Sequence, residues 1–259
     1  LFVGALLPGL LLVALYLLYV AIMAKSKSPT INSDESNSVS RWMLLRDLFP
    51  PIALMAVVLG SILAGAATPT EAAGIGALGA SLLAIAKRQL NINMLSEVVN
   101  STLKITSMVF MILIGATLFS LVFRAYGGDD LVHSFFLDMP GGKYGALMVV
   151  MLVIFLLGFI LDFIEITFVV VPIVAPILMA LGFDPIWLGI MIAINLQTSF
   201  LTPPFGFALF YLRGVAPSSI PTAAIYRGVI PFIVIQLFLL IIITVYPDLV
   251  TWLPQKIYK

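Results

Sequence analysis

Long apolar runs fill most of the chain, and two polar stretches interrupt them in its second half. The first stretch covers residues 158–167 and carries Asp162 and Glu165. The second covers residues 195–206 and carries amides, hydroxyls and a Pro-Pro pair. Polar and ionisable groups at membrane depth are costly, and their default interpretation is a functional site. We therefore interpret both stretches as breaks in membrane helices, and the remaining segments as their scaffold and anchor.

The composition predicts a membrane protein. Of the 259 residues, 62% are hydrophobic and 10% are charged, whereas soluble domains carry about 25% charged residues. The apolar runs are too long for barrel strands, so we predict an all-α, multi-pass helical bundle. The net charge of +1 implies no nucleic-acid partner. The sequence has no cysteine and one histidine, which argues against thiolate chemistry and histidine-based sites, so no catalytic residue is assigned.

Five apolar segments have the character of complete membrane helices. They cover residues 1–24, 49–64, 72–86, 105–123 and 229–246. Residues 25–48 form a polar linker, whose end from Arg41 to Arg46 is either a short interfacial helix or a plain loop. Residues 124–143 are expected to form a loop, and residues 247–259 a tail. Small residues at helical spacing predict close contact with another helix: Ala73, Gly76, Ala77 and Ala80.

Residues 144–182 are expected to enter and leave the membrane on the same side. The apolar residues 144–157 and 168–181 are each shorter than the roughly 20 residues that a spanning helix needs. A re-entrant helical hairpin is therefore favoured, and one kinked span is the alternative. Basic residues mark the cytoplasmic side of membrane proteins. A hairpin puts all basic pairs on that side, whereas a full crossing would move Arg213 and Arg227 to the other.

Residues 185–213 are long enough to cross the membrane, but Thr202, Pro203 and Pro204 must break the helix. Proline lacks the backbone N–H, and the residue before a proline avoids helical angles. An unwound membrane helix frees carbonyl and N–H groups, which are tolerated only when they are buried in protein or line a wet cavity. Freed carbonyls and the C-termini of half-helices favour cations. The sequence therefore predicts a discontinuous membrane helix with a break that can bind ions.

The first break carries two carboxylates three residues apart. On a helix, this spacing places Asp162 and Glu165 on one face. Two close carboxylates cannot easily both ionise, so either one is protonated or a cation lies between them. Either state fits a cation-coupled transporter, with Na⁺ bound by coordination or H⁺ by titration. The alternative is that the carboxylates cap half-helices or pair with a neighbouring subunit.

With these features in hand, the chain resembles the C-terminal half of the large membrane subunit of TRAP transporters, the tripartite ATP-independent periplasmic transporters. The matching stretches follow the family order and are residues 1–9, 67–74, 158–162 and 201–206. Residues 197–200 and 206–213 further resemble the branch linked to 2-oxo acids and related organic acids.

This resemblance implies the second of two inverted repeats in an elevator-type secondary transporter. The implied parts are a last span of the first repeat at 1–24, a polar linker with an interfacial helix at 25–48, scaffold and support spans at 49–143, a transport region of hairpin plus broken helix at 144–213, and a final span with a tail at 214–259. Family members are longer, and the first repeat with its own hairpin is missing from this chain. The segment alone is therefore not expected to transport.

The implied function is a permease subunit that imports a small organic acid, coupled to Na⁺, across the bacterial inner membrane. Its partners would be a small membrane subunit, a periplasmic solute-binding protein and the lipid bilayer. The alternatives are half of another ion-coupled anion transporter, a membrane scaffold that does not transport, and an intramembrane aspartyl-type enzyme. That enzyme needs two aspartates facing each other from different spans, and Asp162 is the only aspartate in mid-span. We therefore expect a transport protein and no enzyme.

The candidate residues form two overlapping sets. The substrate-binding candidates are Asp162, Glu165, Gln197, Thr198, Ser199 and Thr202. The cation-binding candidates are Gly158, Asp162, Thr167, Thr202, Pro203 and Gly206. We predict that the two breaks are halves of one cation site. A separation of more than roughly 15 Å, several times a metal–oxygen bond of about 2.4 Å, would exclude this arrangement.

Overall fold

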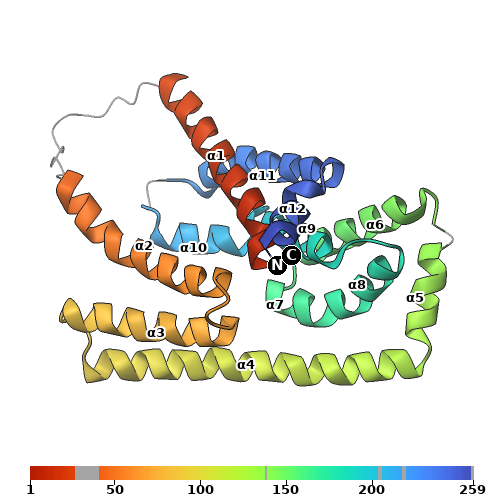
Figure 1. The fold of residues 1–259 in the computed structure, drawn as a ribbon, viewed down its shortest axis with the longest axis horizontal. Helices are drawn as coiled ribbons and strands as arrows, with labels where there is room; N and C mark the ends of the chain where they lie inside the picture. The colour runs from red at the N-terminus through yellow and green to blue at the C-terminus, as the bar shows by residue number, and fades with distance from the viewer. Residues whose placement is uncertain (27–40, 138, 204–205, 218–219, 258–259) are drawn as a thin grey trace. The chain divides into compact units, whose positions relative to one another are not determined.

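The computed structural model describes residues 1–26, 41–137, 139–203, 206–217 and 220–257, and those residues form helices joined by turns, with no strand among them (Figure 1). The predicted all-α class is confirmed. The helices are α1 (Phe2–Ser26), α2 (Arg41–Leu63), α3 (Pro69–Ala86), α4 (Ile92–Ala125), α5 (Gly128–Leu137), α6 (Gly142–Leu157), α7 (Phe163–Glu165), the π-helix η2 (Ile166–Val170), α8 (Val171–Ala180), α9 (Pro185–Leu201), α10 (Phe207–Val215), α11 (Thr222–Val245) and α12 (Asp248–Ile257).

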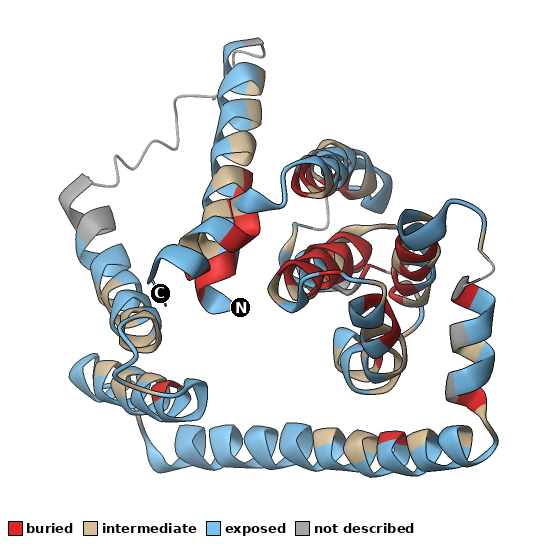
Figure 2. Ribbon diagram, turned by 45° about the vertical axis from the view of Figure 1, so that its right-hand side comes forward, coloured by how far each residue is buried: buried red, intermediate tan, exposed pale blue. Residues whose placement is uncertain are grey.

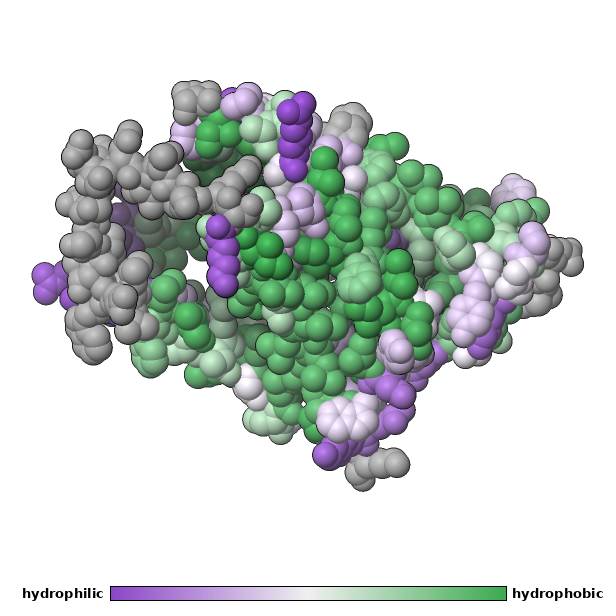
Figure 3. Space-filling view, turned by 90° about the horizontal axis from the view of Figure 1, so that it is seen from above, coloured by the Kyte–Doolittle hydropathy of each residue, from purple (hydrophilic) through white to green (hydrophobic). Residues whose placement is uncertain are grey.

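Membrane-spanning character is widespread in the described part of the chain. Six helical stretches there are long and apolar enough to cross a membrane: Phe2–Lys25, Arg46–Leu63, Pro69–Ala86, Ile92–Ala125, Phe163–Ala180 and Thr222–Val245. Helices α6 and α9 are apolar but shorter. The face drawn in Figure 3 is covered largely by hydrophobic side chains, as expected where lipid replaces water as the solvent. The chain is therefore a multi-pass membrane protein.

The chain packs as two compact units, and the smaller is built mainly from residues 22–106. Its helices α2 and α3 pack against each other. A Cβ added to Gly76 would lie 3.4 Å from the side chain of Val58, and one added to Gly79 would overlap Leu54. Glycine thus allows the close approach that the small residues of α3 predicted. The side chain of Glu71 reaches back to the backbone N–H of Thr68 at 2.8 Å, which caps the start of α3.

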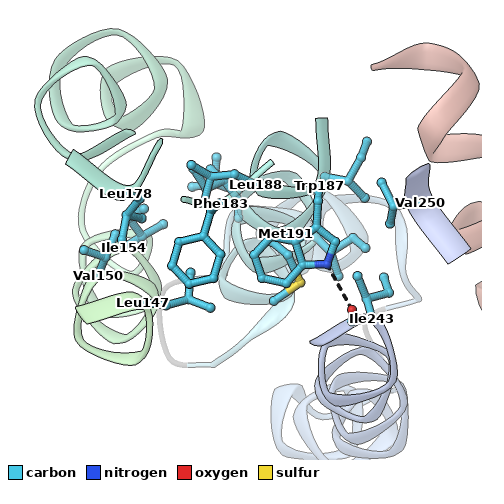
Figure 4. Packing of buried hydrophobic residues seen from close by; sticks show 14 of the residues in the cluster. Leu147, Val150, Ile154, Leu178, Phe183, Trp187, Leu188, Met191, Ile243 and Val250 are labelled. Carbon is cyan, nitrogen blue, oxygen red and sulfur yellow. Dashed lines mark hydrogen bonds between the residues drawn. The ribbon is translucent and has the colours of Figure 1, made fainter. Parts of the chain in front are cut away.

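The larger unit, residues 3–21 and 107–259, contains the core. In Figure 2 the buried residues concentrate in a few helices of this unit, whereas α4 is exposed along nearly its whole length. The main cluster joins α6, α8, α9 and α11 (Figure 4). At its centre Trp187 is 3% exposed, and its indole N–H donates to the carbonyl of Ile243 at 3.0 Å. Helix α9 is therefore packed against both α6 and α11.

Four segments differ from the sequence-based expectation. Helix α2 runs unbroken from Arg41 through Pro50 and Pro51, so residues 41–46 are helical, not a loop, and continue into the following span. The linker residues 27–40 lie outside the described residues. Helix α4 joins residues 92–104 to the span predicted at 105–123. Helix α5 occupies part of the expected loop, and α12 most of the expected tail. Both short helices are amphipathic, with buried faces that include Phe136 and Val250.

Candidate functional site: two helix breaks that meet

The first break lies at the turn of a helical hairpin. Helix α6 ends at Leu157, and the chain resumes helix at Phe163 and continues to Ala180 through α7, η2 and α8. The rings of Tyr144, at the start of α6, and Phe183, just after α8, lie 5.8 Å apart between centroids. The start of the first arm and the end of the second arm therefore lie close together. Gly182 has a φ of +88°, a left-handed conformation that glycine adopts without strain, and it turns the chain into α9.

A tight turn and a capping aspartate form this break. The carbonyl of Leu157 accepts from the N–H groups of Ile160 at 2.9 Å and Leu161 at 2.8 Å, which ends α6. Asp162 is half-buried, and its Oδ1 accepts from the N–H of Phe163 at 2.7 Å. A carboxylate at a helix N-terminus satisfies an orphan donor and is stabilised by the helix dipole. Asp162 therefore caps the return helix, and this cap engages one of its two carboxylate oxygens.

The break is shorter than the predicted stretch 158–167. Helix begins again directly after Asp162, so Glu165 and Thr167 lie on the return helix rather than in the turn. Glu165 is half-buried and Thr167 is exposed. The segment from Ile166 to Val170 is a π-helix, a wider turn that is often found at functional sites.

The second break separates α9 from α10. Asp184 caps the start of α9 by accepting from the N–H groups of Ile186 and Trp187 at 2.9 Å each. The helix ends at Leu201, and Thr202 adopts extended angles with a ψ of 127°. This is the conformation that the residue before a proline favours, so the predicted discontinuity is confirmed. Pro204, within the predicted break, lies outside the described residues.

Backbone oxygens converge where the broken helix ends. A Cβ added to Gly206 would lie 2.9 Å from the carbonyl oxygens of both Phe200 and Thr202. Only glycine lets the chain pass this close to those oxygens. Pro203, beside them, is half-buried. The C-terminal carbonyls of a helix carry partial negative charge, so this end of α9 favours a cation.

The hydroxyl groups near the end of α9 donate to its own backbone. Thr198 donates to the carbonyl of Ile194 at 2.7 Å, Ser199 to that of Leu196 at 2.9 Å, and Thr202 to that of Thr198 at 2.7 Å. A hydroxyl oxygen that donates its proton keeps lone pairs for another partner. Thr198 and Ser199 are buried, at 0% and 1% exposure, Thr202 is half-buried and Gln197 is exposed. The substrate-binding candidates on α9 and at its end therefore differ in burial, from fully buried to exposed.

The two breaks lie side by side. A Cβ added to Gly158 would lie 2.7 Å from the Cβ of Ser199 and closer still to its Oγ. The rings of Phe163 and Phe200 are 6.3 Å apart between centroids, edge to face. The structure therefore brings the turn of the hairpin against the last turn of α9, well within the separation that a shared site allows.

Asn195 is a polar contact that the candidate sets left out. It is 3% exposed, and its amide donates to the carbonyl of Met151 on α6 at 2.8 Å. This bond ties α9 to the first arm of the hairpin, about one turn of α9 before Ser199 meets Gly158. The sequence signal for such a residue is an amide at the end of an apolar helical run, because an amide in the membrane needs a partner.

The donor atoms at this junction are oxygens. No group of three or more His, Cys, Asp or Glu side chains occurs among the described residues in a position to hold a metal ion. The junction instead offers main-chain carbonyls, hydroxyls and the carboxylate of Asp162. Hard cations select oxygen ligands of this kind, and softer transition metals select nitrogen and sulfur.

The comparison with known families decides the identity. Residues 1–249 match the family model of the tripartite ATP-independent periplasmic transporter, DctM component. The chain belongs to the DctM family. The resemblance inferred from the sequence is thereby confirmed, and the family consists of transport proteins, so the expectation that the chain is no enzyme is confirmed as well.

Curated relatives in this family cover almost the whole chain. It is 31% identical over 257 residues to the C4-dicarboxylate TRAP transporter large permease protein of Pseudomonas aeruginosa. It is 27% identical to the sialic acid TRAP transporter large permease protein of Vibrio cholerae, and 28% identical to the ectoine/5-hydroxyectoine TRAP transporter large permease protein of Ruegeria pomeroyi. Each match covers 98% of this chain and 59% of the relative, so the chain spans about three-fifths of their length.

Proposed function

We propose that this DctM segment is the C-terminal half of a Na⁺-coupled permease that imports a small organic acid across the bacterial inner membrane. The observation that carries the proposal is the junction of Gly158 with Ser199, in a chain that belongs to a family of transporters. The relatives are named for chemically different solutes, so the 2-oxo acid branch stays a prediction from residues 197–200 and 206–213.

In this proposal the hairpin of α6 with α7, η2 and α8 is re-entrant. Tyr16 and Tyr19, in the C-terminal half of α1, pack against Phe232, in the N-terminal half of α11, at 5.0 Å and 5.3 Å between ring centroids. The positive-inside rule places Lys25, at the end of α1, and Arg227, near the start of α11, on the cytoplasmic side of the membrane in this proposal. The hairpin then opens on the periplasmic side.

The cation site in this proposal lies at the junction of the two breaks. The carbonyls beside Gly206 and the hydroxyl of Thr202 contribute neutral oxygens from the end of α9. Asp162 contributes negative charge from the start of the return helix. Na⁺ bound between them would join the two arms, and the occupied junction would form one wall of the substrate site. Bound Na⁺ would thereby couple cation binding to solute binding.

The remaining parts of the proposal rest on the family resemblance. The transport region 144–213 would move as a body in an elevator mechanism, supported by the spans within residues 49–143. A first inverted repeat, a small membrane subunit and a periplasmic solute-binding protein would complete the transporter. Because the core joins α9 to α11 as well as to α6, α11 would have to move together with this region.

The test is Na⁺-driven uptake by the complete transporter in proteoliposomes, with Asp162→Asn and Thr202→Val. Each substitution removes one ligand while keeping the size of the side chain. We expect the Na⁺ concentration for half-maximal uptake to rise about tenfold or more, which corresponds to about 1.4 kcal/mol of lost binding. Unchanged Na⁺ dependence and rate in both variants would remove these residues from the site.

Matched controls separate cation binding from helix structure. Asp184→Asn alters a second capping aspartate, at the opposite end of α9. Thr244→Val alters a second threonine whose hydroxyl bonds to the carbonyl four residues earlier, at 2.8 Å. Both controls are expected to leave the Na⁺ dependence unchanged, because neither residue lies at the junction.

A further inference from the structure

A groove of about 300 Å³ opens between α6 and α11, toward the end of the larger unit where the hairpin begins. Its lining residues are Tyr144, Leu147, Met148, Met151, Met191, Leu240, Ile241, Thr244 and Val245. Met191, 3% exposed, belongs to the core, whereas Met148 and Ile241 are 74% and 61% exposed. The groove therefore has a fixed floor and rims that face the surroundings. Its volume is at the lower end of the range for ligand pockets, about 300–1,000 Å³.

The walls of this groove suit a hydrocarbon chain. The hydroxyl of Thr244 already donates to the carbonyl of Leu240 at 2.8 Å. Apart from that group and Tyr144 at the mouth, the lining side chains are aliphatic or thioether. Three of them are methionines, which adapt their shape to an apolar ligand. A polar solute would lose its hydration in this groove without gaining hydrogen bonds, so the substrate of a transporter is a poor occupant.

A positively charged side chain, that of Lys143, lies at the mouth of the groove. Lys143 is exposed, and its Nζ lies 5.4 Å from the ring centroid of Tyr144 and 5.3 Å from that of Phe183. Lysine beside tyrosine is typical of a membrane–water interface. The nearby carboxylate of Asp184 is engaged by two backbone N–H groups at the start of α9. The charge of Lys143 is thus available to an anion whose apolar part lies in the groove.

We propose that the groove binds one acyl chain of an anionic phospholipid, with the lipid phosphate held at Lys143. The charge at the mouth and the apolar groove below it match the two ends of such a lipid. A bound chain would fill the space between α6 and α11, which both contact α9. The lipid would therefore stabilise the packing of the hairpin against the rest of the larger unit.

The experiment uses the complete, delipidated transporter membrane complex. Phosphatidylglycerol or phosphatidylcholine with identical chains is added back, and the melting temperature and the retained lipid are measured, the latter by native mass spectrometry. We expect phosphatidylglycerol to raise the melting temperature more than phosphatidylcholine. Lys143→Gln should bind phosphatidylglycerol about fivefold more weakly, as expected for one lysine near a lipid surface, and Met148→Trp should lose the retained lipid.

Two control variants match these substitutions elsewhere. Lys256→Gln removes a lysine that also lies over an aromatic ring, that of Trp252 at 5.0 Å. Met111→Trp places an indole on another exposed methionine, 71% exposed on α4. Both should behave as the unmodified protein does. Equal effects of the two lipids, or full phosphatidylglycerol binding by Lys143→Gln, would overturn the proposal. So would release of the small membrane subunit by Met148→Trp with lipid retention unchanged, because the groove would then hold a protein helix.

Discussion

There is no room for a methyl group between Gly158 and Ser199. The turn of the hairpin passes directly over the side chain of Ser199, and a Cβ on Gly158 would collide with both its Cβ and its Oγ. The glycine is thus required by close packing, since its φ of −65° is open to any residue. This contact is the most direct physical link between the two breaks.

We predict that Gly158→Ala destabilises the permease by about 1–3 kcal/mol, the usual range for overpacking a close contact. Thermal unfolding of the purified protein measures the loss. Gly115→Ala is the control, because an added Cβ there meets nothing within 4 Å; replacing a helical glycine in open space should stabilise by about 0.5–1 kcal/mol. Adding Ser199→Gly should restore part of the loss. A Gly158→Ala variant as stable as the parent would show that the two breaks are not in tight contact.

Single residues also mark where sequence reasoning reached its limit. The sequence predicted Asp162, Ser199 and Thr202 as members of breaks, because local composition and proline chemistry reveal a break. It gave no means of placing Trp187, whose partner Ile243 lies 56 residues away. The burial of Thr198 and the exposure of Gln197, next to each other on one helix, depend on which neighbours pack against α9. Long-range contacts of this kind produce no recognisable pattern in a uniformly apolar sequence.

At the scale of elements, helix ends are set by short-range chemistry. Helix α9 begins at a capping aspartate followed by Pro185, a residue suited to the first helical position. It ends before the Pro-Pro pair that the sequence had identified. The amphipathic helices α5 and α12 were missed because their Gly, Asp and Pro residues suggested loop. Their apolar positions nevertheless recur at helical spacing, which is the pattern that indicates an amphipathic helix.

Removing the cap of α9 should loosen the start of the most buried helix of the larger unit. We predict that Asp184→Ala costs about 0.5–2 kcal/mol, the range for loss of an N-cap. The loss follows because two backbone N–H groups at 2.9 Å lose their acceptor. The melting temperature reports it. Asp184→Asn is the conservative partner and should be close to the parent, because asparagine caps about as well as aspartate. Equal losses in both variants would assign the effect to charge instead.

At the scale of the whole molecule, the remaining question is which loops face which side. The 259 residues contain no cysteine, so single cysteines introduced into a permease made cysteine-free elsewhere give clean labels. Tyr126, after α4, and Val215, at the end of α10, are 89% and 82% exposed. A re-entrant hairpin between them puts the two positions on opposite sides.

We predict that a membrane-impermeant thiol reagent labels Tyr126→Cys in intact cells and leaves Val215→Cys unlabelled until the membrane is permeabilised. The physical reason is that only α9 and α10 cross between these positions when residues 144–182 return to their starting side. Labelling of both positions from outside would mean that residues 144–182 cross the membrane completely. The return helix Phe163–Ala180 is long enough for that crossing, so the experiment discriminates between two real alternatives.

The burial of α9 between α6 and α11 also has a consequence in time. Its bond from Asn195 reaches Met151, which has already left the ribosome when α9 emerges. Its bond from Trp187 can form only after Ile243 has been synthesised, 56 residues later. At a synthesis rate of about 5–20 residues per second, the delay is about 3–11 s. During those seconds the hairpin and the polar end of α9 are in the membrane before α11 can pack against them. The part of the chain that carries the candidate site is therefore the part most exposed to insertion errors and quality-control proteases while the protein is being made.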